Sequence, residues 1–142
     1  MFDVIDVLAS GLSAARTRVN VLAANIANAE TTRTPEGGPY KRRDVVQVAT
    51  SATSSFSSTL DKMSLYRPSI QAVIADQSEP RKLYQPGHPD ADEDGFVAYP
   101  NINIVSTMTD LMSASRLYQA NVTALESARR MEQEAIRISM RF

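Results

Sequence analysis

Apolar residues recur with a helical spacing at both ends of this chain, and that spacing constrains the fold more than any other feature of the sequence. Near the amino terminus they follow one another at alternating steps of three and four residues. Because about 3.6 residues make one helical turn, such steps place the side chains on one face of a long helix that packs against other helices. We call the positions of this face the amino-terminal seam: Ile5, Leu8, Leu12, Ala15, Val19, Leu22, Ile26 and Ala29.

The last part of the chain, from residue 104 onward, repeats this pattern. Steps of three and four connect the apolar positions up to Leu125, and the spacing resumes after one irregular step of three residues, from Leu125 to Ala128. An irregular step of this kind locally alters the supercoil of packed helices. We call the positions on which this second prediction depends the carboxy-terminal seam: Met108, Leu111, Tyr118, Val122, Leu125, Met131 and Ile138.

The predicted helices are long for a chain of 142 residues. At about 1.5 Å per residue they reach roughly 39 Å and 52 Å, so the first cannot cover the second along its whole length. A chain of this size also has too little other structure to bury both seams. We therefore expect helices of neighbouring subunits to complete the seams, which favours a structural or assembly protein over an enzyme.

The sequence between the helices changes to turn-forming and strand-forming residues. Stretches typical of short strands cover residues 44–49, 69–77, 81–86 and 95–100, and a serine-rich stretch near 50–65 is expected to be a flexible loop. The expected organisation is an amino-terminal helix at 1–30, a small β-rich middle domain at 31–100 and a carboxy-terminal helix at 101–142. The predicted fold class is mainly α, with two long terminal helices, antiparallel or bundled with neighbours, flanking a small β-rich insertion.

Charge and composition argue against several functions. Fifteen basic residues nearly balance sixteen acidic ones, which does not favour nucleic-acid binding. The chain has no cysteine, no glycine-rich phosphate loop and no cluster of metal ligands, so we expect no cofactor, no small-molecule substrate and no catalytic centre. No apolar run approaches the roughly 18 residues of a membrane span, and the first residues do not resemble a cleaved secretory leader.

The stretch HPDADEDG resembles the start of an EF-hand calcium loop, because Asp90, Asp92 and Asp94 alternate and Gly95 stands at the sixth position. The twelfth position requires a bidentate glutamate, but Asn101 occupies it, and the flanking residues are turn-like and strand-like rather than helical. We therefore favour an acidic β-turn whose aspartates bond to nearby backbone groups, with Gly95 at positive φ. A calcium-binding interaction module through these aspartates stays the alternative.

His88 is the only histidine, and it lies between Gly87 and Pro89. A catalytic histidine needs a nucleophile or an orienting acid as partner, and the sequence indicates neither, so we assign His88 to the loop. The basic stretch YKRRD at 40–44 is interpreted as a solvated or ion-paired surface, because the net charge of the chain is close to zero.

Three stretches, in the same order along the chain, resemble the flagellar basal-body rod proteins of bacteria. They are SGLSAARTRVNVLAANIANAETTRTPEGGPYKRRDVV (residues 10–46), PGHPDADEDGFVAYPNINIV (86–105) and MSASRLYQANVTALESARRM (112–131). Most rod and hook relatives continue the first stretch with Thr-x-Gly-Tyr-Lys, whereas the longer TPEGGPYKR form is similar to one proximal-rod branch of the family. The motif residues of the first stretch are Asn25, Asn28, Pro35, Gly37, Gly38 and Tyr40.

This resemblance implies a function that the spacing alone does not give. Proteins of this family are structural components of the periplasmic basal-body rod, are exported by the flagellar type III apparatus without a cleaved leader, polymerise through their terminal helices and transmit motor torque. The implied partners are copies of the chain, other rod proteins, adaptor proteins of the inner-membrane ring and export gate, and the type III export apparatus. The rival interpretation is a cytoplasmic coiled-coil adaptor or chaperone.

Overall fold

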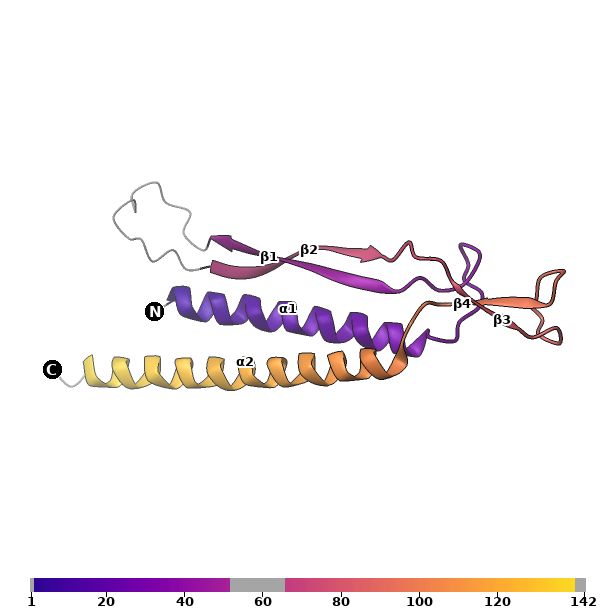
Figure 1. Cartoon of the computed structure of the whole chain (residues 1–142). Coiled ribbons are helices and arrows are strands. Elements are labelled where there is room, and N and C mark those ends of the chain that lie inside the picture. The colour runs from indigo at the N-terminus through magenta and orange to yellow at the C-terminus, as the bar shows by residue number, and fades with distance from the viewer. Residues whose placement is uncertain (1, 52–65, 140–142) are drawn as a thin grey trace.

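A computed structural model describes residues 2–51 and 66–139, which form two long helices and four strands (Figure 1). The elements are α1 (Phe2–Ala27), β1 (Arg43–Ser51), β2 (Tyr66–Ala75), β3 (Arg81–Tyr84), β4 (Phe96–Tyr99) and α2 (Ile104–Ser139). The predicted fold class, mainly α with a small β-rich insertion between terminal helices, is confirmed. The serine-rich loop expected near 50–65 lies almost entirely outside the described residues.

The two helices pack side by side and run antiparallel (Figure 1). Gly11 shows their register, because a Cβ added there would lie 3.4 Å from Asn121 Nδ2. The numbers of opposite residues therefore sum to about 132, which places residue 130 of α2 opposite the start of α1. The nine residues of α2 beyond this point extend about 13 Å past α1. We call residues 131–139 the overhang.

The start of α2 follows from a capping residue. The side-chain oxygen of Asn103, just before the helix, accepts a hydrogen bond from the Ser106 N–H at 3.1 Å. Asparagine is favoured at this position because its side chain satisfies an N–H group that the helix itself leaves unpaired. Asn103 thus sets the residue at which α2 begins.

The strands form two separate two-stranded antiparallel sheets. The sheet of β1 and β2 lies along α1, and the sheet of β3 and β4 lies beyond the ends of the helices (Figure 1). In the first sheet Val46 pairs with Ala72 and Gln47 with Ile70, so Gln71 is an extra residue that forms a β-bulge. In the described part of the chain, α2 packs on α1 and on no strand.

The four predicted strands exist, and they pair as two separate sheets. The cause is their length and position. Strands β1 and β2, of nine and ten residues, are long enough to follow α1, whereas β3 and β4 have four residues each. Local sequence indicates whether a stretch is extended, but it does not show which extended stretches pair.

Small side chains make up most of the buried core. Five buried alanines lie in or next to the helices, namely Ala14, Ala15, Ala29, Ala114 and Ala128, each at most 8% exposed. Alanine at a helix contact lets the two backbones approach closely, since the distance between helix axes depends on the side chains between them.

The covered face of α2 follows one unbroken heptad spacing. Its positions are Thr107, Leu111, Ala114, Tyr118, Asn121, Leu125, Ala128 and Glu132, with Ser115 and Val122 beside them. The covered face does not make the irregular step that we predicted after Leu125, because it continues from Ala128 to Glu132 and not to Met131. Helix α2 has apolar residues on more than one side, and the prediction had joined two sides into one seam.

Candidate assembly surfaces

The amino-terminal seam is partly covered by the chain itself. Ala15 and Ala29 are buried, and the six larger members, Ile5, Leu8, Leu12, Val19, Leu22 and Ile26, are all half-buried. A helix advances about 100° per residue, so these six positions point away from the side of α1 that carries Ser10, Ala14 and Thr17. That other side lines a cavity together with residues of β2. Helix α1 is therefore packed on two sides, by α2 and by the sheet of β1 and β2.

The carboxy-terminal seam divides into covered and exposed members. Leu111, Tyr118, Val122 and Leu125 are half-buried. Met108, Met131 and Ile138 are 50%, 61% and 62% exposed, and the last two lie in the overhang. The structure thus brings four of the seven predicted positions toward α1 and leaves three on the surface of the chain.

Five further large apolar residues of α2 are exposed and lie outside the predicted seam. They are Ile104, Val105, Met112, Leu117 and Ile136, which are 39%, 76%, 59%, 51% and 49% exposed. Their signal was present in the sequence as apolar residues outside the predicted spacing. An amphipathic helix of a single folded unit normally keeps one apolar face. Additional apolar residues on its other sides indicate additional contacts.

Asn25 joins α1 to the start of β1. It is fully buried, and its side-chain amide makes three hydrogen bonds. Nδ2 donates to the Arg43 carbonyl oxygen at 2.8 Å, while Oδ1 accepts from the Arg43 N–H at 2.9 Å and from the Tyr40 hydroxyl at 3.1 Å. The Asn25 amide therefore satisfies both main-chain groups of Arg43, as the main chain of a neighbouring strand would.

Asn28 ends α1. Its Nδ2 donates to the Ala24 carbonyl oxygen at 2.9 Å, and its Oδ1 accepts from the Thr31 hydroxyl at 3.2 Å. The last carbonyl groups of a helix lack partners within the helix, and a side-chain donor satisfies one of them here. Asn28 thus fixes the direction in which the chain leaves the helix.

The TPEGGP motif forms a tight loop between α1 and β1. Thr34 N–H donates to the Gly38 carbonyl oxygen at 2.9 Å, and Gly37 and Gly38 have φ values of 92° and 74°. Only glycine adopts such values without strain, which explains the paired glycines after Pro35. The Tyr40 N–H then donates to the Thr31 carbonyl oxygen at 3.0 Å and closes the loop.

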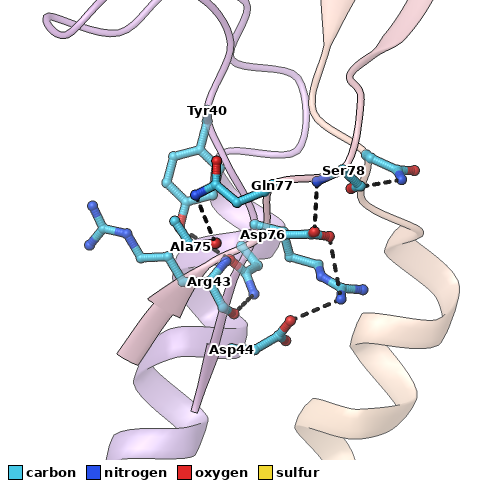
Figure 2. A network of polar contacts seen from close by, with 10 residues as sticks. Tyr40, Arg43, Asp44, Ala75, Asp76, Gln77 and Ser78 are labelled. Atoms are coloured by element: carbon cyan, nitrogen blue, oxygen red, sulfur yellow. Dashed lines mark hydrogen bonds and ion pairs between the residues drawn. The ribbon is translucent and has the colours of Figure 1, made fainter. Parts of the chain in front are cut away.

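Arg42 lies at the end of the first sheet where β1 begins and β2 ends. Its Nη2 lies 2.9 Å from Asp44 Oδ2 and 3.5 Å from Asp76 Oδ2, and Figure 2 shows both carboxylates near one guanidinium group. Asp76 also accepts a hydrogen bond from the Ser78 N–H at 2.9 Å. The hydrogen bonds from Ser78 lower the pKa of the Asp76 carboxyl, and the charge of Arg42 adds to this effect. In the described part of the chain, Arg42 Nε is buried without a hydrogen-bond acceptor.

Tyr40 lies between this cluster and Asn25. Partial burial raises the pKa of its hydroxyl, and the nearby charge of Arg43 partly offsets that effect. The guanidinium carbon of Arg43 lies 5.9 Å from the centre of the Tyr40 ring, within range of a cation–π contact. Tyr40 therefore serves as a packed structural residue whose hydroxyl donates a hydrogen bond to Asn25 Oδ1.

The acidic stretch forms the predicted β-turn. Asp92 Oδ1 accepts hydrogen bonds from the Asp94 N–H at 3.1 Å and from the Phe96 N–H at 2.7 Å, and Gly95 has φ 79°. Asp90 accepts a hydrogen bond from the Thr32 hydroxyl at 2.8 Å. Asp90 and Asp92 are thus engaged by donors of the protein, and the prediction of a structural turn is confirmed. Among the described residues, no group of three or more histidine, aspartate or glutamate side chains is placed to hold a metal ion.

His88 also serves the turn. Its Nδ1 accepts a hydrogen bond from the Asp90 N–H at 3.1 Å, and its ring lies edge-on to Tyr99 with the ring centres 6.4 Å apart. The placement of His88 in the loop is confirmed. Through Asp90, which also lies 3.7 Å from the Arg33 guanidinium, this loop is joined to the segment that follows α1.

Neither helix, within its described residues, has an apolar stretch long enough to cross a membrane. Two family models match the chain at its two ends. The model described as flagella basal body rod protein matches residues 5–33, and the one described as flagellar basal body rod FlgEFG protein C-terminal matches residues 93–138.

Several relatives match nearly the whole chain. The flagellar basal-body rod protein FlgC of Borreliella burgdorferi is 35% identical over 97% of both chains. FlgC of Salmonella typhimurium is 34% identical over 92% of both. FlgC of Bacillus subtilis is 35% identical over 96% of this chain and 97% of its own. The two matched ends coincide with the two helices and the turn before α2.

Proposed function

Because this chain belongs to the family of flagellar basal-body rod proteins, in its FlgC branch, we propose that it builds the proximal part of the rod by packing its terminal helices against those of neighbouring subunits. The chain is a structural component of the flagellar basal-body rod. In our proposal it passes torque from the motor toward the hook through many helix contacts. No catalytic step and no cofactor is part of this role.

One observation carries the proposal: the paired helices leave large apolar side chains exposed on α2, including Leu117, Met131 and Ile138. Burying a side chain of this size contributes about 1.5–3 kcal/mol. Several such side chains on one helix favour association, and regular heptad spacing makes another helix the suitable partner. The amino-terminal and carboxy-terminal seams supply further contact area where they are only half-buried.

The proposed partners follow from the position in the rod. Copies of this chain and other rod proteins would pack beside its helices, and adaptor proteins of the inner-membrane ring and export gate would contact it at the base. We include the flagellar type III apparatus as the route of export. Support for these partners comes from family membership and from the exposed faces of the helices.

A direct test uses flagellated cells whose own copy is deleted and replaced by a tagged chain. We expect the chain in purified basal bodies, in the fraction that contains the rod, and restored swimming. Recovery of the chain only from the cytosol would favour the rival interpretation, a cytoplasmic coiled-coil adaptor or chaperone, and would overturn the proposal.

The role of the exposed apolar residues is tested by Leu117→Asp. We expect this variant to keep the helical circular dichroism of the parent, because Leu117 is 51% exposed, but to be lost from basal bodies. Gln119→Asp is the matched control, since Gln119 is an exposed polar residue of the same helix. Equal incorporation of both variants would contradict the proposed role of the apolar residues.

A further inference from the structure

Helix α2 carries a second set of residues with heptad spacing on a side that α1 leaves open. We call it the outer stripe of α2: Leu117, Ala120, Ala124, Ser127, Met131 and Ile138. All six residues are exposed. Six charged residues lie between Leu117 and Ile138 in the sequence, and only Glu134 falls on this spacing, between Met131 and Ile138. An exposed helix face that carries large apolar side chains and a single charge is suited to packing against another helix.

Helix α1 carries a corresponding stripe on its own open side. The outer stripe of α1 consists of Ala9, Ser13, Arg16, Asn20, Ala23 and Ala27, at alternating steps of four and three residues. All six are exposed, and three of them are alanine. Small residues at heptad positions leave holes into which larger side chains fit. Met131 and Ile138 of the outer stripe of α2 are side chains of that kind.

Residues of opposite charge lie in or next to the two outer stripes, and Arg16 belongs to the outer stripe of α1. Arg16 lies in α1 and Glu30 in the turn after it, while Arg116 and Glu134 lie on α2. Eighteen residues separate the last two, which is about five full turns, so they lie on the same side of the helix. All four side chains belong to exposed residues, and none of them takes part in an ion pair within the described part of the chain.

An antiparallel pairing of the two outer stripes brings these charges together. Arg16 then lies near Glu134, and Glu30 lies near Arg116. In two antiparallel helices the residue numbers of opposite positions add up to a constant, and this sum defines the register. The pair of Arg16 and Glu134 gives 150 and the pair of Glu30 and Arg116 gives 146, so both pairs fit one register with a sum near 148. In that register the overhang, residues 131–139, faces residues 9–17 of α1. The overhang has no helix opposite it within its own chain, since the register inside the chain has a sum near 132.

Building on the proposed function, we propose that the outer stripe of α2 binds the outer stripe of α1 in a second copy of this chain. The difference of 16 residues between the two registers shifts the neighbouring copy by about 24 Å along the helices. The contact joins two different surfaces of the chain, so a joined pair keeps one free surface of each kind, the α1 stripe of one copy and the α2 stripe of the other. Such a heterologous contact forms an open series of subunits rather than a closed dimer.

The size of the contact explains where it forms. About 19 residues of each helix overlap, over roughly 28 Å, and a helix contact about 10 Å wide buries on the order of 300 Å² per helix. A stable interface between two proteins needs about 800 Å² per partner. The contact is therefore too small to hold a dimer in dilute solution, and we expect it in the assembled rod, where each subunit has several neighbours.

Paired cysteines test the register, because the natural chain contains no cysteine that would confuse the result. In the proposed contact Ala23 of one copy faces Ala124 of the next. We therefore expect a full chain with Ala23→Cys and Ala124→Cys to form a ladder of dimers, trimers and larger products when basal bodies are oxidised. Both alanines are exposed, so the substitutions do not disturb the core. The matched control is Ala27→Cys with Ala135→Cys, which lies about 21 Å out of register. A disulfide cannot span that distance.

The possible results separate this inference from the proposed function. A ladder from the first pair and none from the control supports the register. A ladder from the control only, or crosslinks that stop at the dimer, would contradict the shifted contact. The proposed function would still stand in that case, because the chain is in the rod. A disulfide-linked product that contains a different rod protein would show that the partner of the stripe is not a second copy of this chain. Absence of the chain from basal bodies overturns the proposed function itself.

Charge reversal gives an independent test of the same register. Arg16→Glu alone and Glu134→Arg alone are each expected to lower the yield of the crosslinked ladder about two- to fivefold, as for one exposed ion pair. The double reversal is expected to restore it. Loss that is merely additive in the double variant would show that the two side chains do not meet.

Discussion

Helices α1 and α2 are built on the same heptad principle, but the chain covers them to different extents. Helix α1 has α2 on one side and the sheet of β1 and β2 on another, and its buried residues include Ala14, Ala15 and Asn25. Helix α2 has α1 on one side, and among its described residues only Thr107, Ala114 and Ala128 are buried. The difference indicates that α1 holds the subunit together, whereas α2 leaves the larger apolar side chains exposed for neighbours.

The largest loss of stability is expected when the Asn25 side chain, which joins α1 to β1, is removed. In Asn25→Ala, the main-chain N–H and carbonyl group of Arg43 and the Tyr40 hydroxyl lose their partner at a buried position. Each unsatisfied buried group costs about 1–3 kcal/mol, so we expect the free energy of unfolding to fall by about 3 kcal/mol in urea titrations. Asn20→Ala, on the exposed side of the same helix, is the control and should change it by less than about 0.5 kcal/mol.

Enlarging one alanine on each helix tests the difference directly. Ala14→Leu inserts a larger side chain at a position that is 3% exposed and should destabilise the chain by about 1–3 kcal/mol. Ala124→Leu, at an exposed position of α2, should change the free energy of unfolding by less than about 0.5 kcal/mol. Thermal or urea unfolding of the two variants measures both values. Equal destabilisation would mean that α2 is covered as fully as α1.

The ion pairs of Arg42 should contribute less, and only above acid pH. The pKa of the Asp76 carboxyl is lowered in the folded chain, so its charge stabilises the fold above the unfolded pKa and this contribution is lost as pH falls through the folded value. We expect Asp76→Asn to be less stable than the parent at neutral pH. The difference should shrink as the pH falls below about 3.8, which urea titrations at several pH values would reveal. A difference that stays constant with pH would exclude the charge as its cause.

The smallest effect on stability is expected in the overhang. Met131 is 61% exposed and lies beyond the start of α1, so Met131→Lys should leave the free energy of unfolding unchanged within about 0.5 kcal/mol. Its incorporation into basal bodies should nevertheless fall, because the apolar side chain faces a neighbour. Gln133→Lys, an exposed residue on another side of α2, serves as the control. A marked loss of stability in Met131→Lys would show that the overhang is packed within the single chain.

Sequence alone was sufficient for the features that repeat or that follow from one local rule. The heptad spacing predicted both helices, and the positive φ of Gly95 followed from the acidic turn around it. The partner of Asn25 could not be predicted, because it lies 18 residues away and across a loop. The several faces of α2 were also missed, since spacing identifies apolar positions but does not say which of them a neighbouring element of the same chain covers.

The antiparallel pairing also has a consequence for the order in which the molecule can fold. Gly11 and Asn121 are neighbours in space but 110 residues apart in the chain. Contacts between distant residues form slowly, because a long loop must close first. The first helix emerges from the ribosome early and finds its partner only when almost all of the chain has been made. Until then α1 lacks the helix that packs on it, so the complete subunit forms only at the end of synthesis.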